Sequence, residues 1–197
     1  MHDEFVKSNR DRWNQLAAVG VRHSKPFFHY TREDAKTRIS RYGILNDVKG
    51  KRVLCLGGGG GQDSVAFGLL EAEVTVLDLS DVQLERDAQA ASYHSLRTVC
   101  VQGDMRDLGA FSSSSFDIVW QPYSLNYSPT VTPVFEEVAR VLIVGGIYYV
   151  TFANPFVIQV TDDNCWNGTG YVLRGSYVDG EDISKYCPQW SVVQEDG

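Results

Sequence analysis

Five consecutive glycines directly after a short apolar run constrain the fold of this chain more than any other feature. The run at 52–56 is apolar after its first residue, which is typical of a strand buried on both faces of a parallel sheet. The glycines at 57–61 follow, and a segment with helical periodicity begins at Asp63. Such a turn lets a ligand approach the backbone closely, and the helix beyond it offers N–H groups. The sequence therefore predicts a strand, a turn and a helix that together bind a ligand.

The spacing of these glycines discriminates between the ligands that such a turn can bind. A dinucleotide fingerprint requires G-x-G-x-x-G, but both registers of the run place Gln62 or Asp63 where the last glycine is needed. No Gly-Lys-Ser/Thr occurs, which excludes a P-loop. The spacing G-x-G-x-G fits at Gly57, Gly59 and Gly61. Taken alone, the run is also compatible with a flexible turn that binds nothing.

Apolar strands and amphipathic helices alternate through the centre of the chain. We predict strands at 52–56, 73–78, 98–101, 116–120 and 147–152, with helices after 63, at 81–92 and over 131–142. Gly145-Gly146 is expected to end the last of these helices. Strands that alternate with helices imply right-handed crossovers. The predicted fold class is α/β, with a Rossmann-like, doubly wound and mostly parallel sheet.

Two helices are predicted ahead of this sheet, as an N-terminal helical extension. One helix face combines Phe5, Asn9, Trp13 and Leu16, and a second combines Ala35, Ile39 and Tyr42, with Gly43 at the helix end. The second helix begins with a capping box at 31–34. We therefore predict one domain with three parts: a helical cap on the substrate side at 1–48, a ligand-binding core at 49–155, and an irregular segment at 156–197. Within the last part, 171–174 and 176–178 could pair as a hairpin around Gly175.

A carboxylate at the end of the second predicted strand supports the ligand-binding interpretation. Asp78 lies 21 residues after Gly57. A carboxylate at this place faces the crevice of a doubly wound sheet and can accept both hydroxyl groups of a ribose. NAD and S-adenosylmethionine (AdoMet) both carry that ribose, so Asp78 does not decide between them. A helix-capping role is the alternative for this residue.

The segment after the third strand carries a resemblance that does separate these ligands. Gly103-Asp-Met-Arg-Asp-Leu108 resembles the G-D-[MA]-x-x-L motif of the class I AdoMet-dependent methyltransferases. The resemblance continues through 116–120 and 141–146, and it covers roughly residues 50–155. It implies that Asp104 accepts the adenine amino group, that Met105 packs against the ring, and that Leu79 and Gln121 also contact the cofactor. A thioether is suited to packing on a ring edge.

The same resemblance implies where the methyl acceptor binds. The segment Asn9-Arg-Asp-Arg-Trp13-Asn14 is similar to the N-terminal helix of ubiquinone/menaquinone-biosynthesis-like methyltransferases, which covers the cofactor and helps form the substrate pocket. The segment after the fourth strand is expected to lie beside the methionine part of the cofactor. The predicted substrate residues are Trp13, Tyr30, Tyr123, Asn126 and Tyr127. No catalytic residue is assigned, although His23, His29 and His94 could act as a general base near neutral pH.

The chain also departs from the pattern of this family. Cys55 stands where the first strand usually has an acidic residue that orders the glycine loop, and Val144 replaces the proline of the L-x-P-G-G turn. No closing helix and β6–β7 hairpin can be recognised. That hairpin is therefore expected to be missing or replaced by 156–197, and a chain truncated at its C-terminus is one explanation.

Charge and cysteine content bound the partners of the chain. The net charge of −7 makes nucleic acid an unlikely partner, although 1–52 carries 12 Lys/Arg against 6 Asp/Glu. No CxxC pair occurs, so no metal site is predicted. No segment looks like a signal peptide or a membrane span, which makes the cytoplasm the expected location. A homodimer is left open.

Three functions follow from the sequence. The first is an AdoMet-dependent methyltransferase that acts on a small-molecule acceptor. The second is a non-catalytic AdoMet-binding or scaffold protein, which the unusual C-terminal segment leaves open. The third is an NAD-dependent Rossmann oxidoreductase, which the failed glycine spacing and the segment at 103–108 disfavour.

Overall fold

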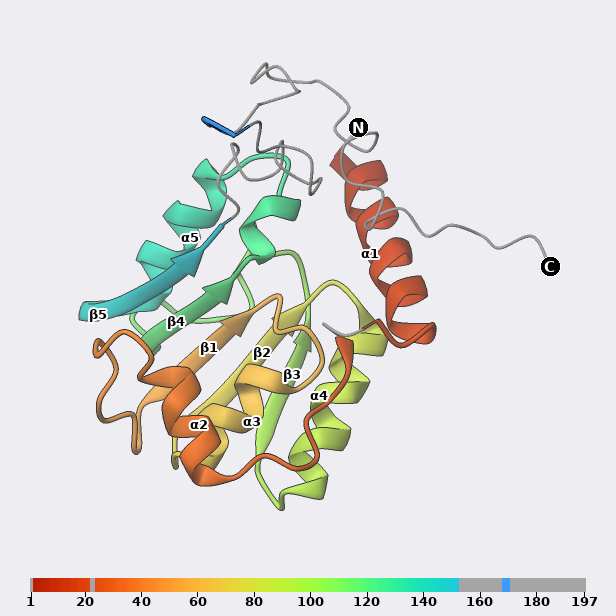
Figure 1. Cartoon of the computed structure of the whole chain (residues 1–197). Helices are drawn as coiled ribbons and strands as arrows, with labels where there is room; N and C mark the ends of the chain where they lie inside the picture. The colour runs from red at the N-terminus through yellow and green to blue at the C-terminus, as the bar shows by residue number, and fades with distance from the viewer. Residues whose placement is uncertain (1, 22–23, 153–167, 171–197) are drawn as a thin grey trace. The chain divides into compact units, whose positions relative to one another are not determined.

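The structure is a computed structural model that describes residues 2–21, 24–152 and 168–170 (Figure 1). The chain divides into two compact units, Met1–Thr151 and Phe152–Gly197. The predicted hairpin at 171–178 and almost all of the irregular segment lie outside the described residues. In the described part of the chain, no helix has the length and apolar character needed to cross a membrane.

Five parallel strands form the centre of the first unit. They are β1 (Arg52–Leu56), β2 (Glu73–Asp78), β3 (Thr98–Gln102), β4 (Phe116–Pro122) and β5 (Leu142–Thr151), in the order β3-β2-β1-β4-β5. All neighbouring pairs are parallel, with Cys55 opposite both Val76 and Trp120. The doubly wound order starts at β1 and runs outward in both directions. This confirms the predicted α/β, Rossmann-like fold class.

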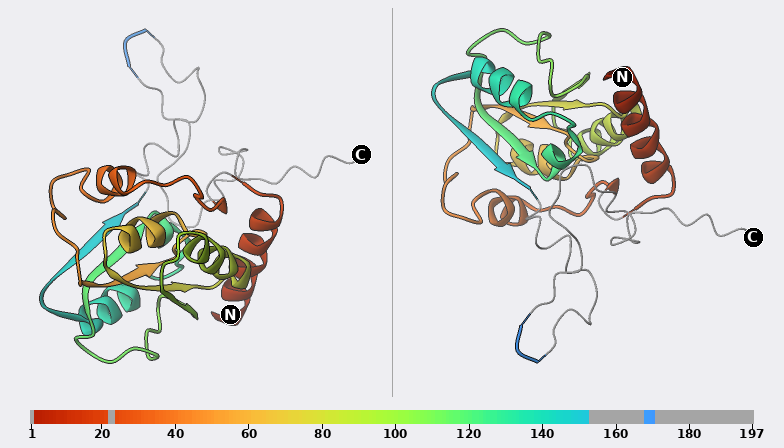
Figure 2. Two further views of the ribbon diagram at one scale, coloured as in Figure 1. Left: turned by 90° about the horizontal axis from the view of Figure 1, so that it is seen from below. Right: turned by 90° about the horizontal axis from the view of Figure 1, so that it is seen from above.

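Helices cover both faces of the sheet. The helices α2 (Arg32–Ile39), α3 (Gln62–Leu69) and α4 (Asp81–Tyr93) share one buried cluster with β1, β2 and β4, and α5 (Thr132–Val141) contributes to a second cluster on the other face. Figure 2 shows these two layers from below and above. The first helix, α1 (His2–Ala18), lies beside α4 at the margin of the sheet (Figure 1).

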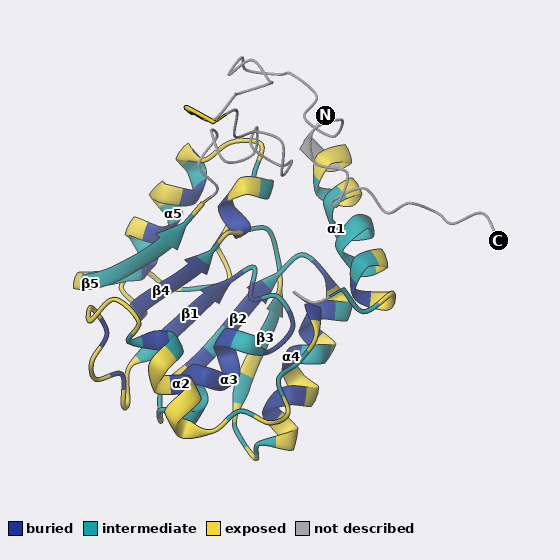
Figure 3. Cartoon of the chain, viewed as in Figure 1, coloured by how far each residue is buried: buried dark blue, intermediate teal, exposed yellow. Residues whose placement is uncertain are grey.

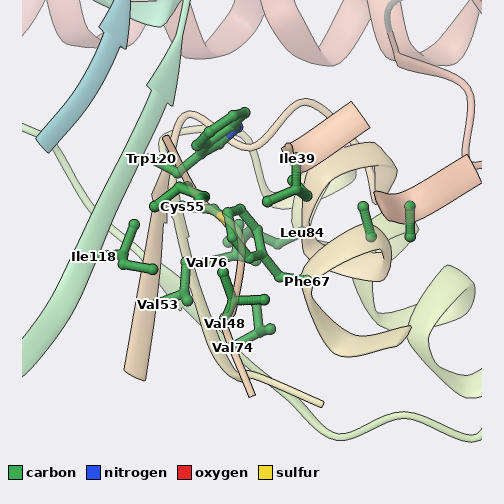
Figure 4. Packing of buried hydrophobic residues seen from close by; sticks show 13 residues of the cluster. Ile39, Val48, Val53, Cys55, Phe67, Val74, Val76, Leu84, Ile118 and Trp120 are labelled. Carbon is green, nitrogen blue, oxygen red and sulfur yellow. The ribbon is translucent and has the colours of Figure 1, made fainter. Parts of the chain in front are cut away.

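The cluster under α2, α3 and α4 is an aromatic and aliphatic core (Figure 4). Trp120 packs edge-on against Phe67, with ring centroids 5.3 Å apart, and it stacks on Tyr149 of β5 at 3.8 Å. Cys55 is fully buried in the same cluster. Alternate residues of each strand face this side, as the two-residue period of a strand requires.

The β3 and β5 strands are less buried than the centre of the sheet (Figure 3). Val99 of β3 is 59% exposed and Cys100 is only partly buried. Cys100 is exposed in part because β3 is at the margin of the described sheet and has one neighbour.

The start of β5 differs from the prediction. The helix α5 ends at Val141 and the strand begins at Leu142, so the glycines expected to end the helix lie inside the strand. Leu142 pairs with Phe116, and Ile147 is the next residue to pair, with Ile118. Two steps along β4 therefore match five along β5, which is a bulge at Gly145, where φ is +80°. The β-branched residues Val141, Ile143 and Val144 favour extended backbone over a further helical turn.

The second predicted helix starts as expected and ends early. Thr31 and Asp34 form the capping box: the Thr31 side chain accepts the Asp34 N–H, and the Asp34 carboxylate accepts the Thr31 N–H at 2.9 Å. The helix ends at Ile39, four residues before Gly43. Tyr42 is therefore outside the helix, 62% exposed, and stacked near Tyr149 at 6.4 Å. The prediction that Tyr42 continues the apolar helix face is wrong.

Candidate cofactor site

The predicted cofactor residues come together at one edge of the sheet. In a parallel sheet all carboxyl ends lie on the same side, and the segments after β1, β2, β3 and β4 meet there. The glycine turn follows β1, Asp78 ends β2, Asp104 and Met105 follow β3, and Gln121 lies near the end of β4. This edge includes the point at which the strand order reverses, between β1 and β4.

The glycine turn packs so closely that side chains would not fit. Gly57, Gly59, Gly60 and Gly61 all have positive φ, between +62° and +96°. A Cβ atom on Gly57 would lie 2.5 Å from the Cβ of Ser124, and one on Gly61 would lie 2.7 Å from that of Ala90. Ser124 is itself fixed, because its hydroxyl donates to the Leu56 carbonyl at 2.7 Å. The glycine turn is therefore packed in one defined conformation and is not a flexible connection.

Substitution of Gly57 by alanine tests this close packing. Gly57→Ala is expected to destabilise the protein by more than the roughly 1–2 kcal/mol that a left-handed backbone costs an alanine, because its Cβ also collides with Ser124. Gly43→Ala is the matched control, since Gly43 has φ +69° and no atom within 4 Å of the added Cβ. Urea denaturation measures both, and equal losses would show that the Ser124 contact contributes nothing.

Asp78 is placed as predicted, at the carboxyl end of β2. Its carboxylate accepts the Ser80 N–H at 2.9 Å. Burial raises the pKa of Asp78 to about 6, and the N–H groups of Ser80, Gly59 and Leu79 lower it in part. The Leu79 carbonyl accepts a hydrogen bond from Gln102 at 3.0 Å. A carboxylate held this way is ionised at neutral pH and can accept further hydroxyl groups.

The residues after β3 and near the end of β4 are linked. Arg106 donates to both oxygens of Asp104, with its Nε at 3.0 and 2.9 Å. Gln121 has no exposed surface, and its Nε2 donates to the Met105 sulfur at 3.0 Å, while the Tyr148 hydroxyl donates to its Oε1 at 2.5 Å. The hydrogen bond from Gln121 therefore holds the Met105 side chain in place. The Arg106 backbone N–H also donates to Asp104 at 2.9 Å and its Nη2 donates to the second oxygen, so Arg106 occupies the acceptor positions of Asp104 in this structure.

The first helix reaches the same edge. The Trp13 ring meets the Tyr127 ring edge-on, with centroids 5.0 Å apart, and Asn9 Nδ2 donates to the Tyr127 carbonyl at 2.8 Å. Tyr127 ends a short 3-10 helix, Ser124–Tyr127, that follows β4. Burial raises the pKa of Tyr127, so its hydroxyl stays protonated at neutral pH. The structure thus brings together two of the predicted substrate residues.

A second set of contacts ties α1 to the loop after Asp78, which the sequence did not reveal. Asn14 Nδ2 donates to the Asp81 carboxylate at 2.8 Å, and the Ser80 hydroxyl donates to Asn14 Oδ1 at 2.5 Å. Arg86 of α4 also donates to the Ala17 carbonyl near the end of α1. The helix is therefore attached on both sides of the cofactor edge. These partners lie 66 to 69 residues apart in the sequence, so no local pattern indicates them.

The other predicted substrate residues have surroundings of their own. Tyr30 packs near Phe27, with centroids 5.1 Å apart, and beside Arg38. Tyr123 is 60% exposed with φ +59°, and Asn126 is exposed.

The structure gives no support for His94 or His29 as a general base. His94 lies at the far end of α4, with its Nε2 2.9 Å from the Phe27 carbonyl. His29 is exposed, and His23 lies outside the described residues.

Three polar side chains behind the glycine turn were missed from the sequence. Asp87 and Gln83 lie one turn apart on the buried face of α4, and Ser64 lies in the first turn of α3. Asp87 accepts the Gly60 N–H at 3.2 Å and the Ser64 hydroxyl at 2.5 Å. The available signal was a polar residue among the apolar positions of a helix, such as Asp87 between Leu84 and Ala91.

Gln83 has an unusual environment that leads to a stability prediction. It is 1% exposed, and neither its Nε2 nor its Oε1 has a hydrogen-bond partner among the described residues. An unsatisfied buried amide costs roughly 1–3 kcal/mol. Gln83→Met keeps the volume and removes the polar atoms, so we expect the free energy of unfolding in urea to rise by about 1 kcal/mol. A clear loss of stability would mean that the amide has a partner in solution.

Comparison with known proteins identifies the domain that carries this site. Residues 54–150 match the family described as a methyltransferase domain. An uncharacterized methyltransferase, YbaJ of Bacillus subtilis, is 37% identical over 140 residues, which are 71% of this chain and 55% of that protein. A ubiquinone biosynthesis O-methyltransferase of Xanthomonas oryzae is 34% identical over 113 residues, 55% of this chain and 45% of that protein. The chain thus spans about half the length of these curated relatives.

A solved structure agrees with the sequence relatives. The S-adenosylmethionine-dependent methyltransferase from Mesorhizobium loti superimposes with a TM-score of 0.55 at 25% identity, over 68% of this chain and 59% of that one. The matched region contains β2, β3 and β4, most of β1 and β5, the glycine turn, Asp78 and Asp104-Met105. The domain formed by residues 54–150 therefore belongs to the class I S-adenosylmethionine-dependent methyltransferases.

Proposed function

We propose that this chain binds AdoMet at the carboxyl edge of its sheet and transfers the methyl group to a small-molecule acceptor. The observation that carries the proposal is the meeting of three motifs at one edge: the tightly packed turn at 57–61, the carboxylate of Asp78, and Asp104-Met105. The division into a cap at 1–48, a core at 49–155 and a segment at 156–197, and the cytoplasmic location, are also proposals.

The residues present fit the parts of this cofactor. Asp78 would accept the ribose hydroxyls, because its carboxylate is ionised at neutral pH and lies at the carboxyl end of β2. Asp104 would accept the adenine amino group by exchanging one of its hydrogen bonds from Arg106 for it, with Met105 against the ring. The glycine turn would lie along the methionine end, where the absence of side chains allows close approach.

Methyl transfer from AdoMet requires the protein mainly to position the acceptor against the methyl group. AdoMet supplies a methyl group on a sulfonium that is a good leaving group. The protein has to hold the acceptor atom roughly 3 Å from that carbon, in line with the bond that breaks. Trp13 and Tyr127 are suited to this task, since they form an aromatic pair at the cofactor edge and aromatic faces attract a sulfonium. No residue is assigned as a base.

A small-molecule acceptor is supported by the neighbouring surface and by relatives. The pair Trp13–Tyr127 offers apolar surface with one hydroxyl, which suits an aromatic or aliphatic molecule. The net charge of −7 does not suit nucleic acid. A ubiquinone biosynthesis O-methyltransferase is among the similar proteins, which favours acceptors of this chemical type in the first screen.

A methyl-transfer screen tests the proposal. The protein is incubated with radiolabelled AdoMet and quinol, catechol, amine and carboxylate acceptors, and the labelled products are separated. Labelled product from at least one acceptor class, lost when Asp78 is replaced, is the expected result. Binding of AdoMet without transfer to any class would instead support a non-catalytic AdoMet-binding protein.

A further inference from the structure

We propose that Asp87 is a positioning residue of the cofactor site, which fixes the glycine turn from behind through Gly60 and Ser64. The inference rests on the proposed function, because it concerns the shape that the turn presents to AdoMet. Asp87 does not touch the cofactor edge itself: it has no exposed surface and is carried by the second turn of α4.

Asp87 accepts one hydrogen bond from the turn and one from the helix that follows it. One carboxylate oxygen accepts the Gly60 N–H at 3.2 Å, and the other accepts the Ser64 hydroxyl at 2.5 Å. Gly60 lies within the turn, and Ser64 lies in the first turn of the following helix α3. Glycines with positive φ have many alternative conformations, so a turn of five needs such anchors to keep a single shape.

The strand beneath the turn supplies no charged anchor. Cys55 of β1 is fully buried, and burial with Asp63 and Asp87 nearby holds the pKa of its thiol well above the usual range. It is therefore a neutral, weakly hydrogen-bonding group. Figure 4 shows Cys55 among hydrophobic side chains. The charged anchor of the turn thus comes from α4 rather than from β1.

Among the described residues, no ion pair involves Asp87. The ionisable groups around it are Asp78 at the end of β2, Asp63 on α3, Cys55 on β1 and Cys100 on β3. Asp63 is itself paired with Arg38 at 2.5 Å. Burial, with Asp78 and Asp63, raises the pKa of Asp87 to about 7, while the Ser64 and Gly60 donors lower it. A buried carboxylate without a cation weakens a core, so its contacts with the turn are what it contributes.

The first test replaces the carboxylate with its neutral isostere. Asp87→Asn is expected to weaken the binding of AdoMet and of its demethylated product about tenfold at pH 8, measured by calorimetry. Hydrogen exchange of residues 57–64 in the ligand-free variant is expected to be faster than in the wild type. Glu85→Gln is the matched control, because Glu85 is exposed on the same helix, and it should leave both readouts unchanged. Wild-type affinity and exchange in Asp87→Asn would overturn the proposal.

A second variant tests the proposal even if Asp87→Asn does not fold. The pH profile of AdoMet affinity in the wild type is expected to fall as the pH drops through about 7, where Asp87 gains a proton. Ser64→Ala keeps the carboxylate but removes a donor that lowers the pKa of Asp87, so the midpoint of the profile should move to higher pH. An unchanged midpoint would contradict the proposal.

The two proposals can fail separately. If the wild type binds neither AdoMet nor its demethylated product, the proposed function fails, while hydrogen exchange at 57–64 still reports whether Asp87 orders the turn. If the wild type binds and Asp87→Asn binds equally well, with wild-type exchange, only the role of Asp87 is wrong.

Discussion

Replacing Asp78 with asparagine is expected to weaken AdoMet binding by roughly 10- to 100-fold at pH 8. The carboxylate lies at the end of β2 and is ionised at this pH, since its pKa is about 6. Hydrogen bonds to a charged group contribute about 1.5–3 kcal/mol each, and asparagine offers the ribose one uncharged acceptor oxygen in place of two charged ones. Calorimetric titration of both proteins measures the difference.

Glu73→Gln is the matched control for this prediction. Glu73 is an exposed carboxylate at the opposite end of the same strand, so it should have no effect on AdoMet affinity. Asp78→Asn also removes a group that the Ser80 N–H donates to, and the unfolding temperature of the free variant checks that the loop is retained. An Asp78→Asn protein that is folded and binds AdoMet as tightly as the wild type would remove Asp78 from the site.

The free protein is expected to lose stability as the pH rises from about 5 to 8. Burial raises the pKa of Asp78 to about 6 and that of Asp87 to about 7, above the value of an unfolded aspartate. Between these values the folded state binds more protons than the unfolded chain, so raising the pH favours unfolding. For Asp87 the effect is at most on the order of 4 kcal/mol, at roughly 1.4 kcal/mol for each pKa unit.

Urea denaturation across this pH range measures the effect. Several other carboxylates, among them Asp117 and Glu137, have lowered pKa values, so their contribution is lost only at more acidic pH and does not mask this trend. Asp87→Asn should flatten the slope between pH 6 and 8, whereas Glu85→Gln should keep it. Stability that rises with pH over this range in the wild type would contradict the burial of these two carboxylates.

The stability of the free protein and its affinity for AdoMet are therefore expected to change with pH in opposite directions. Lower pH stabilises the free protein because Asp78 and Asp87 gain protons, yet the same protons remove the charges that accept the ribose and hold the turn. A site that reduces the stability of its own fold in this way is typical of functional residues.

The elements around the site could be predicted from the sequence because their signals are local. The strands β1 and β2 were predicted with the bounds that the structure has, since apolar runs end there at Gly57 and Asp78. The cap of α2 was correct because Thr31 and Asp34 are three residues apart and interact directly. The start of β5 was wrong because a glycine pair can end a helix or form a bulge, and only pairing with β4 decides.

The parts that the sequence did not reveal depend on contacts between distant residues. Asp87 and Gly60 are 27 residues apart, and Asn14 and Asp81 are 67 apart. On a helix, Asp87 alone looks like any polar residue, and only the packing of α4 behind the turn makes it an anchor. Tyr123 was grouped with Trp13 because the family resemblance places the segment after the fourth strand beside the methionine part of the cofactor, but a resemblance does not give the surroundings of a single side chain, and Tyr123 is 60% exposed.

Calorimetric titration with AdoMet, its demethylated product and NAD tests the central claim most directly. The arrangement of the turn at 57–61, Asp78 and Asp104-Met105 predicts saturable binding of AdoMet and of the product, with no binding of NAD. Binding of NAD, or no binding of AdoMet and product at millimolar concentration, would contradict it.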